Sequence, residues 1–85
     1  MNRTQISAIS RISETIGDML ATIDDIYDSE VRRRENNYNS SEIKSKATAN
    51  IQSLDTAYNE LITVCKSLRF IIENECEVIT DEKNP

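Results

Sequence analysis

The apolar residues in the first part of the chain recur every seven positions. Two rows alternate in steps of three and four residues; they consist of Ile9, Ile16 and Ile23, and of Ile12, Met19 and Ile26. A third row, made of Ile6, Leu20 and Tyr27, widens the stripe to about three positions in seven. This spacing predicts an amphipathic α-helix, and its width is more typical of a helix in a bundle than of a two-stranded coiled coil.

Small residues flank this stripe on one side, at Ala8, Thr15, Thr22 and Ser29. They would let a neighbouring helix approach closely, although border positions also simply tolerate small residues. The apolar pattern stops after Val31, where Arg32, Arg33 and Arg34 would lie near the unpaired carbonyls of a helix C-terminus. Residues 35–41 are the most polar stretch, and asparagine there tolerates the left-handed conformation that often ends a helix. We therefore predict a first helix over about residues 4–35 and a loop over about 36–39.

The loop is followed at once by signals that start a second helix. Asn39 is predicted to cap it, with Glu42 three residues later as the reciprocal partner. Tyr38 and Ile43 are spaced to form a hydrophobic staple across the cap. These signals place the second helix at about residues 40–79, followed by a frayed acidic tail over 80–85. They also argue against one continuous helix through the polar stretch.

The second helix repeats the wide apolar face of the first. Its three rows are Ala47, Leu54, Leu61 and Leu68; Ala57, Val64, Ile71 and Val78; and Ile51, Tyr58, Cys65, Ile72 and Ile79. Asn50 interrupts an inner position, where it could fix the register of a bundle or lie in water. A single glycine and a single proline in 85 residues leave little material for turns, which excludes sheet-rich folds. The fold class expected is all-α: one antiparallel two-helix hairpin domain over residues 1–80.

One helix cannot cover so wide an apolar face on its neighbour. We therefore expect the hairpin to pair into a four-helix bundle, either as a homodimer or with a different helical protein. The second helix is richest in apolar residues toward its end, beyond what the first helix can cover. The partner interface predicted there consists of Ile62, Leu68, Phe70 and Ile72. The alternative is that the second helix is simply more buried there within its own hairpin.

Charged residues gather in two places. An acidic surface stripe on the outer side of the first helix consists of Glu14, Asp18, Asp25 and Asp28. A basic tip at the loop consists of Arg32, Arg33, Arg34, Lys44 and Lys46; with Glu35 and Glu42 its net charge is +3. The stripe could bind a basic protein or mimic nucleic-acid phosphates, and the tip could bind an acidic partner. Solvated helix faces and a complemented helix end explain both more simply.

The sequence offers no chemistry for catalysis. It lacks histidine and a glycine-rich phosphate loop, so no base, metal site or cofactor site is expected, and we expect no enzymatic activity. Cys65 and Cys76 on one helix would be about 16 Å apart, beyond the roughly 7 Å Cα limit for a disulfide. Two thiols indicate a reducing compartment, the cytoplasm. No apolar run is long enough for a membrane, and the net charge of −5 argues against nucleic acid as the main partner.

These patterns favour a helical adaptor, regulator or inhibitor that binds protein. Small acidic chains of this composition are common among phage and mobile-element proteins. In length and hairpin shape the chain resembles the WXG-type substrates of type VII secretion. Its loop, however, holds neither Trp nor Gly, and neither Tyr27 nor Tyr58 is followed by an acid four residues later. A third interpretation, a small RNA-binding hairpin dimer, would require a basic outer face where the first helix is acidic.

Overall fold

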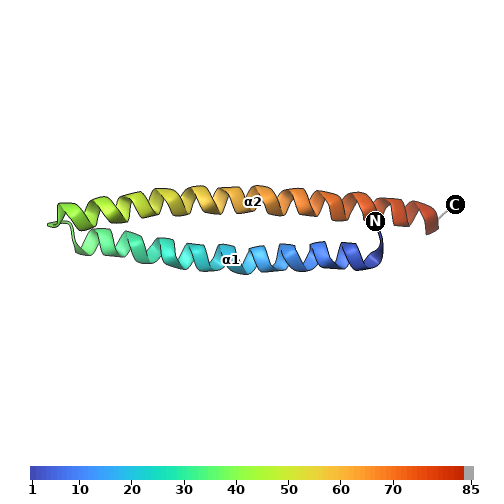
Figure 1. Cartoon of the computed structure of the whole chain (residues 1–85), viewed down its shortest axis with the longest axis horizontal. Coiled ribbons are helices and arrows are strands. Elements are labelled where there is room, and N and C mark those ends of the chain that lie inside the picture. The colour runs from blue at the N-terminus through green and yellow to red at the C-terminus, as the bar shows by residue number, and fades with distance from the viewer. Residues whose placement is uncertain (84–85) are drawn as a thin grey trace.

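The chain folds as two long helices that lie side by side and run in opposite directions (Figure 1). The computed structural model describes residues 1–83, and the side chains of residues 1–76. Helix α1 spans Arg3–Asn36 and helix α2 spans Ser41–Lys83, with no strand among the described residues. The predicted all-α hairpin is therefore confirmed. The tail expected to fray, residues 80–85, continues α2 to Lys83, and its side chains and residues 84–85 lie outside the described residues.

Helix α1 begins with a reciprocal cap at Asn2. The Asn2 side chain accepts a hydrogen bond from the Gln5 backbone N–H at 2.8 Å, and the Gln5 side chain accepts one from the Asn2 N–H at 3.1 Å. Two of the amides that a helix start leaves unpaired are satisfied in this way. The first turn is thereby fixed although it carries no acidic residue.

The turn between the helices is closed by asparagine and serine side chains. The Asn37 amide donates to the Arg33 carbonyl at 2.8 Å, and the Ser40 N–H donates to the Asn37 carbonyl at 2.9 Å. The Ser40 hydroxyl accepts from the Ile43 N–H at 3.4 Å, so Ser40 caps α2. The prediction of Asn39 as the cap was wrong by one residue, because serine and asparagine cap equally well and tertiary geometry decides between neighbours.

Two further details of the turn differ from expectation. No residue among 1–83 adopts a positive φ; Asn37 lies at φ −122°, because its side chain rather than a left-handed backbone satisfies a terminal carbonyl. Tyr38 is 71% exposed, so it does not form the predicted staple with Ile43. Shifting the cap to Ser40 also moves Tyr38 out of the position that a staple requires.

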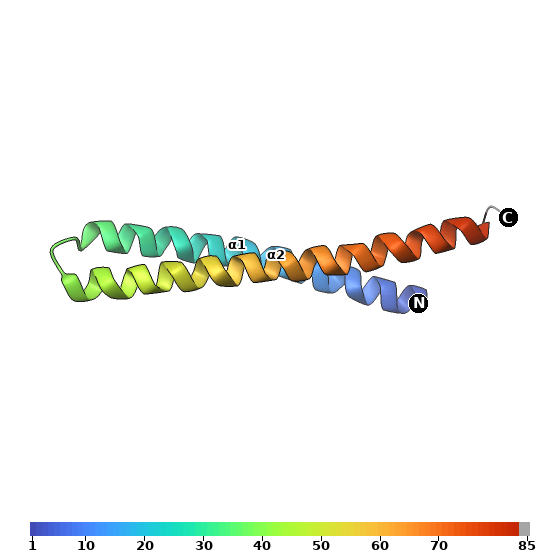
Figure 2. The same ribbon diagram turned by 90° about the horizontal axis from the view of Figure 1, so that it is seen from above.

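The hairpin is a thin rod that buries little of its surface. Its Cα atoms extend over 69 × 15 × 14 Å, and its radius of gyration is 19.3 Å, against about 12 Å for a compact domain of this length. The helices cross at a shallow angle, and α2 reaches beyond the start of α1 (Figure 2). Among the described side chains only Ile16, Ala47 and Ile51 are buried. The hairpin therefore has a seam between two helices and no core around which further layers pack.

The seam uses only part of each apolar stripe. On α1 it takes the row of Ile9, Ile16 and Ile23 together with the row of Ile6, Leu20 and Tyr27, all buried or half-buried. The remaining row stays outside: Ile12 is 50% exposed, Met19 44% and Ile26 45%. On α2 the rows that begin at Ala47 and Ile51 enter the seam, whereas Val64 of the third row is 45% exposed. Helix α1 thus leaves one apolar row uncovered, whereas on α2 only Val64 of the third row is exposed and Ala57 and Ile71 are half-buried.

Candidate functional site

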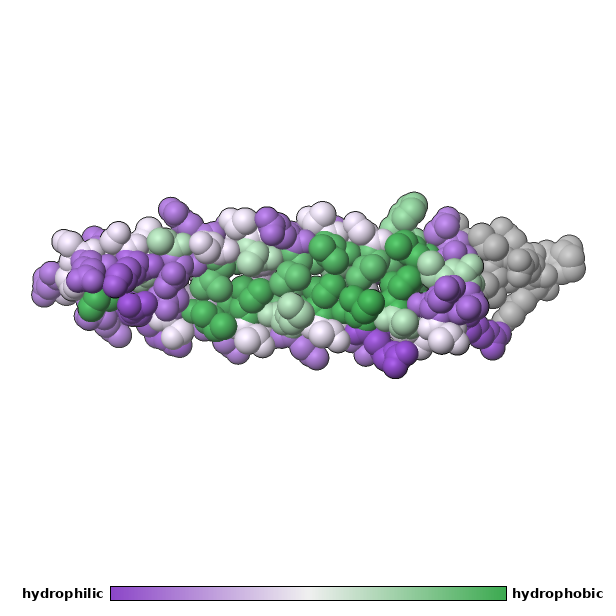
Figure 3. Space-filling model, in the orientation of Figure 1, coloured by the Kyte–Doolittle hydropathy of each residue, from purple (hydrophilic) through white to green (hydrophobic). Residues whose placement is uncertain are grey.

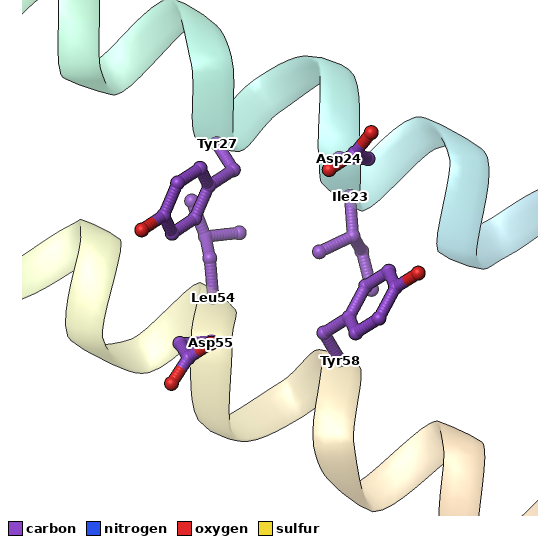
Figure 4. A pocket seen from close by; sticks show the side chains of 6 residues that line it. All are labelled: Ile23, Asp24, Tyr27, Leu54, Asp55 and Tyr58. Carbon is purple, nitrogen blue, oxygen red and sulfur yellow. The ribbon is translucent and has the colours of Figure 1, made fainter.

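One side of the seam is polar and slightly hollowed. Asp24 of α1 and Asp55 of α2 line the same shallow hollow of about 210 Å³ (Figure 4). Four seam residues form the rest of its lining: Ile23, Tyr27, Leu54 and Tyr58. The volume is below the roughly 300 Å³ at which ligand pockets usually begin. Because both aspartates line it, the flanks of α1 and α2 that carry them lie on the same side of the hairpin.

The opposite side of the seam is apolar. Since the aspartate flanks share one side, the rows on the other flank of each helix share the other side. These rows carry Ile12, Met19, Ile26 and Val64, which we call the apolar face. Figure 3 shows apolar side chains gathered along the middle of one side of the rod, over both helices, with polar groups toward the loop. An exposed and continuous apolar surface of this kind is typical of an interaction site.

Threonines border the apolar face along α1. The Thr15 hydroxyl donates to the Arg11 carbonyl at 3.0 Å, and the Thr22 hydroxyl donates to the Asp18 carbonyl at 3.1 Å. Both hydroxyl protons are already hydrogen-bonded within the helix. A partner that covers these residues would therefore not need to supply an acceptor for either of them. Thr15 also lines a shallow groove with Ile12, Ile16 and Met19. The row of small residues noted in the sequence therefore lies beside the apolar face, where a neighbouring helix could approach.

The four residues predicted as a partner interface do not lie on one surface. Leu68 and Ile72 are half-buried and belong to the rows that form the seam with α1. Phe70 lies two residues from each, and therefore on the side of α2 away from α1, where it is 69% exposed. Ile62 is half-buried on the polar flank that also carries Asp55. The contact of these residues with a partner stays a prediction, and only Phe70 among them is prominently exposed.

The two charged surfaces lie where the helix geometry requires. All four residues of the acidic surface stripe, Glu14, Asp18, Asp25 and Asp28, are exposed. At the basic tip, Arg33 pairs with Glu30 at 3.2 Å and Lys46 with Glu42 at 3.1 Å. Such exposed pairs stabilise a protein by less than about 1 kcal/mol. Arg32, Arg34 and Lys44 form no ion pair among the described side chains, so the tip keeps its positive charge toward solvent.

The remaining candidate groups are scattered along the rod. Cys65 is half-buried and Cys76 is exposed on the same helix. Over residues 1–76, no three His, Cys, Asp or Glu side chains come together in a way that could hold a metal ion. Neither helix, over its described residues, has a stretch long and apolar enough to cross a bilayer. Asn50 is exposed and limits the apolar row of α2 on the side of the loop.

Comparisons with other proteins add no assignment to this geometry. No protein-family model matches the sequence, and searches of curated proteins and of solved structures gave no match either. The class of protein is therefore defined by the fold and its surfaces: a two-helix hairpin with one open apolar face.

The sequence pattern contained the residues of the apolar face but not their role. Ile12, Met19 and Ile26 form one of the two alternating rows that predict the first helix, but the repeat does not say which row faces α2. The two borders of the stripe on α1 differ. The border away from Met19 is polar, because Gly17 and Asp24 lie there. That asymmetry indicates which border of the stripe can still accept an apolar partner.

Proposed function

We propose that this chain is a non-enzymatic protein–protein interaction module, a small adaptor or regulator that acts by packing its helices against a partner. The observation that carries the proposal is the apolar face, formed by Ile12, Met19, Ile26 and Val64. Each of these side chains is between 44% and 50% exposed in the hairpin. The partner completes a helical bundle, for which a four-helix arrangement is the simplest form.

The free energy of burial supports a partner with an apolar face of its own. Full burial of a large aliphatic side chain contributes about 1.5–3 kcal/mol. Covering the exposed half of such a side chain therefore stabilises the complex by about 1 kcal/mol per residue. Four such residues contribute about 4 kcal/mol, which only reaches the lower limit of the cost of association, about 4–15 kcal/mol. A partner that contributes a similar apolar surface would about double the gain. A purely polar ligand would not offset the cost.

The proposal is tested by placing a charge at the centre of the apolar face. Met19→Glu should abolish both self-association in light scattering and the capture of any protein from an extract of the native host. Gln52→Glu is the matched control, because Gln52 is exposed outside the face and the substitution adds the same charge. It should behave as wild type. Circular dichroism confirms that both variants remain helical.

A third variant, Phe70→Glu, tests the surface predicted from the sequence. If Phe70→Glu prevents association while Met19→Glu does not, the partner binds on the outer side of α2 and the apolar face is the wrong site. If no association of any kind depends on either residue, the proposed function is wrong.

A further inference from the structure

We infer that the apolar face binds one amphipathic helix of a different protein, whose apolar stripe is flanked by lysines or arginines. This inference rests on the proposed function and states the chemistry of its partner. Three features of the described residues carry it: the width of the apolar face, its closed ends, and the acidic side chains along both of its edges.

The apolar face is only as wide as one helix. On α1 it is a single row, Ile12, Met19 and Ile26, and the exposed Thr15 and Thr22 border that row. Figure 3 shows the narrow apolar band with polar residues along its edges. Although a four-helix bundle is the simplest form of the proposed assembly, one helix laid along the seam covers this row together with the apolar residues of α2.

The edge of the face on α2 is polar as well. Val64 is the exposed apolar residue there, and Glu60 lies one turn before it, on the side away from α1. Glu60 also lines a shallow groove with Ala57 of the same face. Ser53 and Ser67, seven residues before and after Glu60, are exposed in the same row. The apolar surface therefore ends at this row.

Charged and capping residues close the face at both ends. Arg33 lies seven residues after Ile26, where the row of α1 would continue, and it pairs with Glu30 at 3.2 Å. Gln5 lies seven residues before Ile12, and its side chain accepts a hydrogen bond in the helix cap. The row from Ile12 to Ile26 is therefore about 21 Å long. A helix of about 21 residues, or about 32 Å, covers it with about one turn to spare at each end.

Three carboxylates, which we call the acidic rim, lie along the two edges of the face: Asp18, Asp25 and Glu60. Asp18 lines one shallow groove with Met19 and both bordering threonines. Asp25 lies seven residues further along the same row of α1, and Glu60 lies on the edge of α2. All three are exposed and form no ion pair among the described side chains. They are therefore free to pair with cations of a partner.

The acidic rim borders the middle of the apolar face from both helices. Asp24 and Asp55 line one hollow and lie at about the same level of the rod. Toward the start of α1, Asp18 is six residues from Asp24, and Glu60 is five residues from Asp55 in the same direction, or about 9 and 7.5 Å. Asp18 and Glu60 thus lie at nearly the same level, on either side of the face at Met19.

The charge of the rim determines the chemistry of the partner. From Glu14 to Glu30 the chain contains six acids and no base, and the cation at the edge of the face, Arg11, lies near the start of α1. A helix on the face directs the residues beside its apolar stripe toward the rim. The unpaired carboxylates attract lysine or arginine there and repel glutamate. A second copy of the chain would bring the same acidic rim and a net charge of −5 to the interface, so a different, basic helix fits better.

Two synthetic helical peptides of about 21 residues test the inference on the pure full chain. Both carry one stripe of leucines at steps of three and four residues, and they differ in having lysine or glutamate beside the stripe. Fluorescence anisotropy measures their dissociation constants. The lysine peptide should bind at least about tenfold more tightly, as three exposed ion pairs would give. The difference should shrink in about 1 M salt, which screens exposed charges.

Two matched triple variants test where the charge must lie. One replaces the carboxylates of the acidic rim by amides: Asp18→Asn, Asp25→Asn and Glu60→Gln. The control does the same to three carboxylates on the polar side of the seam: Asp24→Asn, Asp55→Asn and Glu73→Gln. The rim variant should weaken binding of the lysine peptide by about tenfold, and the control should leave it nearly unchanged. Equal effects of the two variants would mean attraction to net charge alone and would overturn the inference.

The variant Met19→Gln separates this inference from the proposed function. It keeps the charge of the chain but places an amide in the apolar interface, so it should weaken binding of both peptides by about tenfold. If the two peptides bind equally and both depend on Met19, the basic partner is wrong and the proposed function stands. A Met19-dependent dimer of the pure chain in light scattering has the same meaning. If the lysine peptide does not bind, or binds without regard to Met19, the inference is overturned.

Discussion

Replacing Gly17 with alanine tests how the two flanks of α1 differ. Gly17 lies in the interior of a 34-residue helix, on the flank opposite Met19. A Cβ atom built at this position meets no atom within 4 Å. Its backbone φ is not positive, so an alanine fits without strain. The substitution therefore removes only the helix-weakening effect of glycine.

The size of the effect follows from helix propensity. Glycine in a helix interior costs about 0.8–1.0 kcal/mol relative to alanine. Because no contact opposes the substitution, Gly17→Ala should raise the free energy of unfolding by about that amount. For a domain of this length, about 1 kcal/mol corresponds to a rise in Tm of about 4–8 °C. A partner on the apolar face leaves the Gly17 flank open, so the dissociation constant of that complex should not change.

Thermal melts followed by circular dichroism, at one fixed protein concentration, measure this prediction. Ala21→Gly on the same helix is the matched control, because Ala21 is exposed and its replacement should lower the free energy of unfolding by about 1 kcal/mol. If Gly17→Ala lowers Tm or weakens association while the control behaves as expected, another chain packs closely against Gly17. The partner would then bind the polar side of the seam, and the assignment of the apolar face would be refuted.

Three further substitutions test the seam and the turn. The Ser13 hydroxyl is buried without a hydrogen-bond partner among the described residues. Ser13→Ala should therefore raise the free energy of unfolding, measured by urea denaturation, by about 1 kcal/mol. A decrease in the free energy of unfolding would mean that the hydroxyl is hydrogen-bonded. Ser40→Ala should lower it by about 1 kcal/mol, because the cap of α2 is lost. Asn39→Ala should change it by less than about 0.5 kcal/mol. The opposite order of the Ser40 and Asn39 effects would restore Asn39 as the cap.

Local signals in the sequence were sufficient to predict the two helices and the position of the turn. The seven-residue repeat, the arginines at the end of α1 and the polar stretch around Asn37 act over a few residues each. The two helices begin and end within a few residues of the expected positions. The cap was misplaced only between Asn39 and Ser40. Two adjacent residues with similar capping strength cannot be separated by local preference, because the direction in which the chain enters α2 depends on how the two helices pack.

Which apolar rows meet across the seam was decided by tertiary structure. The row of Ile16 can pair with the row of Met19 or with the row of Leu20, since both combinations give steps of three and four residues. They differ by a rotation of α1 of about 50°, which changes no local interaction of the helix. Packing against α2 selects the Leu20 row, which buries the Ser13 hydroxyl oxygen and leaves Met19 exposed. The sequence by itself thus determined that the apolar stripe is too wide for one neighbour. Only the tertiary structure determined which side of the hairpin remains uncovered, because that choice depends on contacts between residues far apart in the chain.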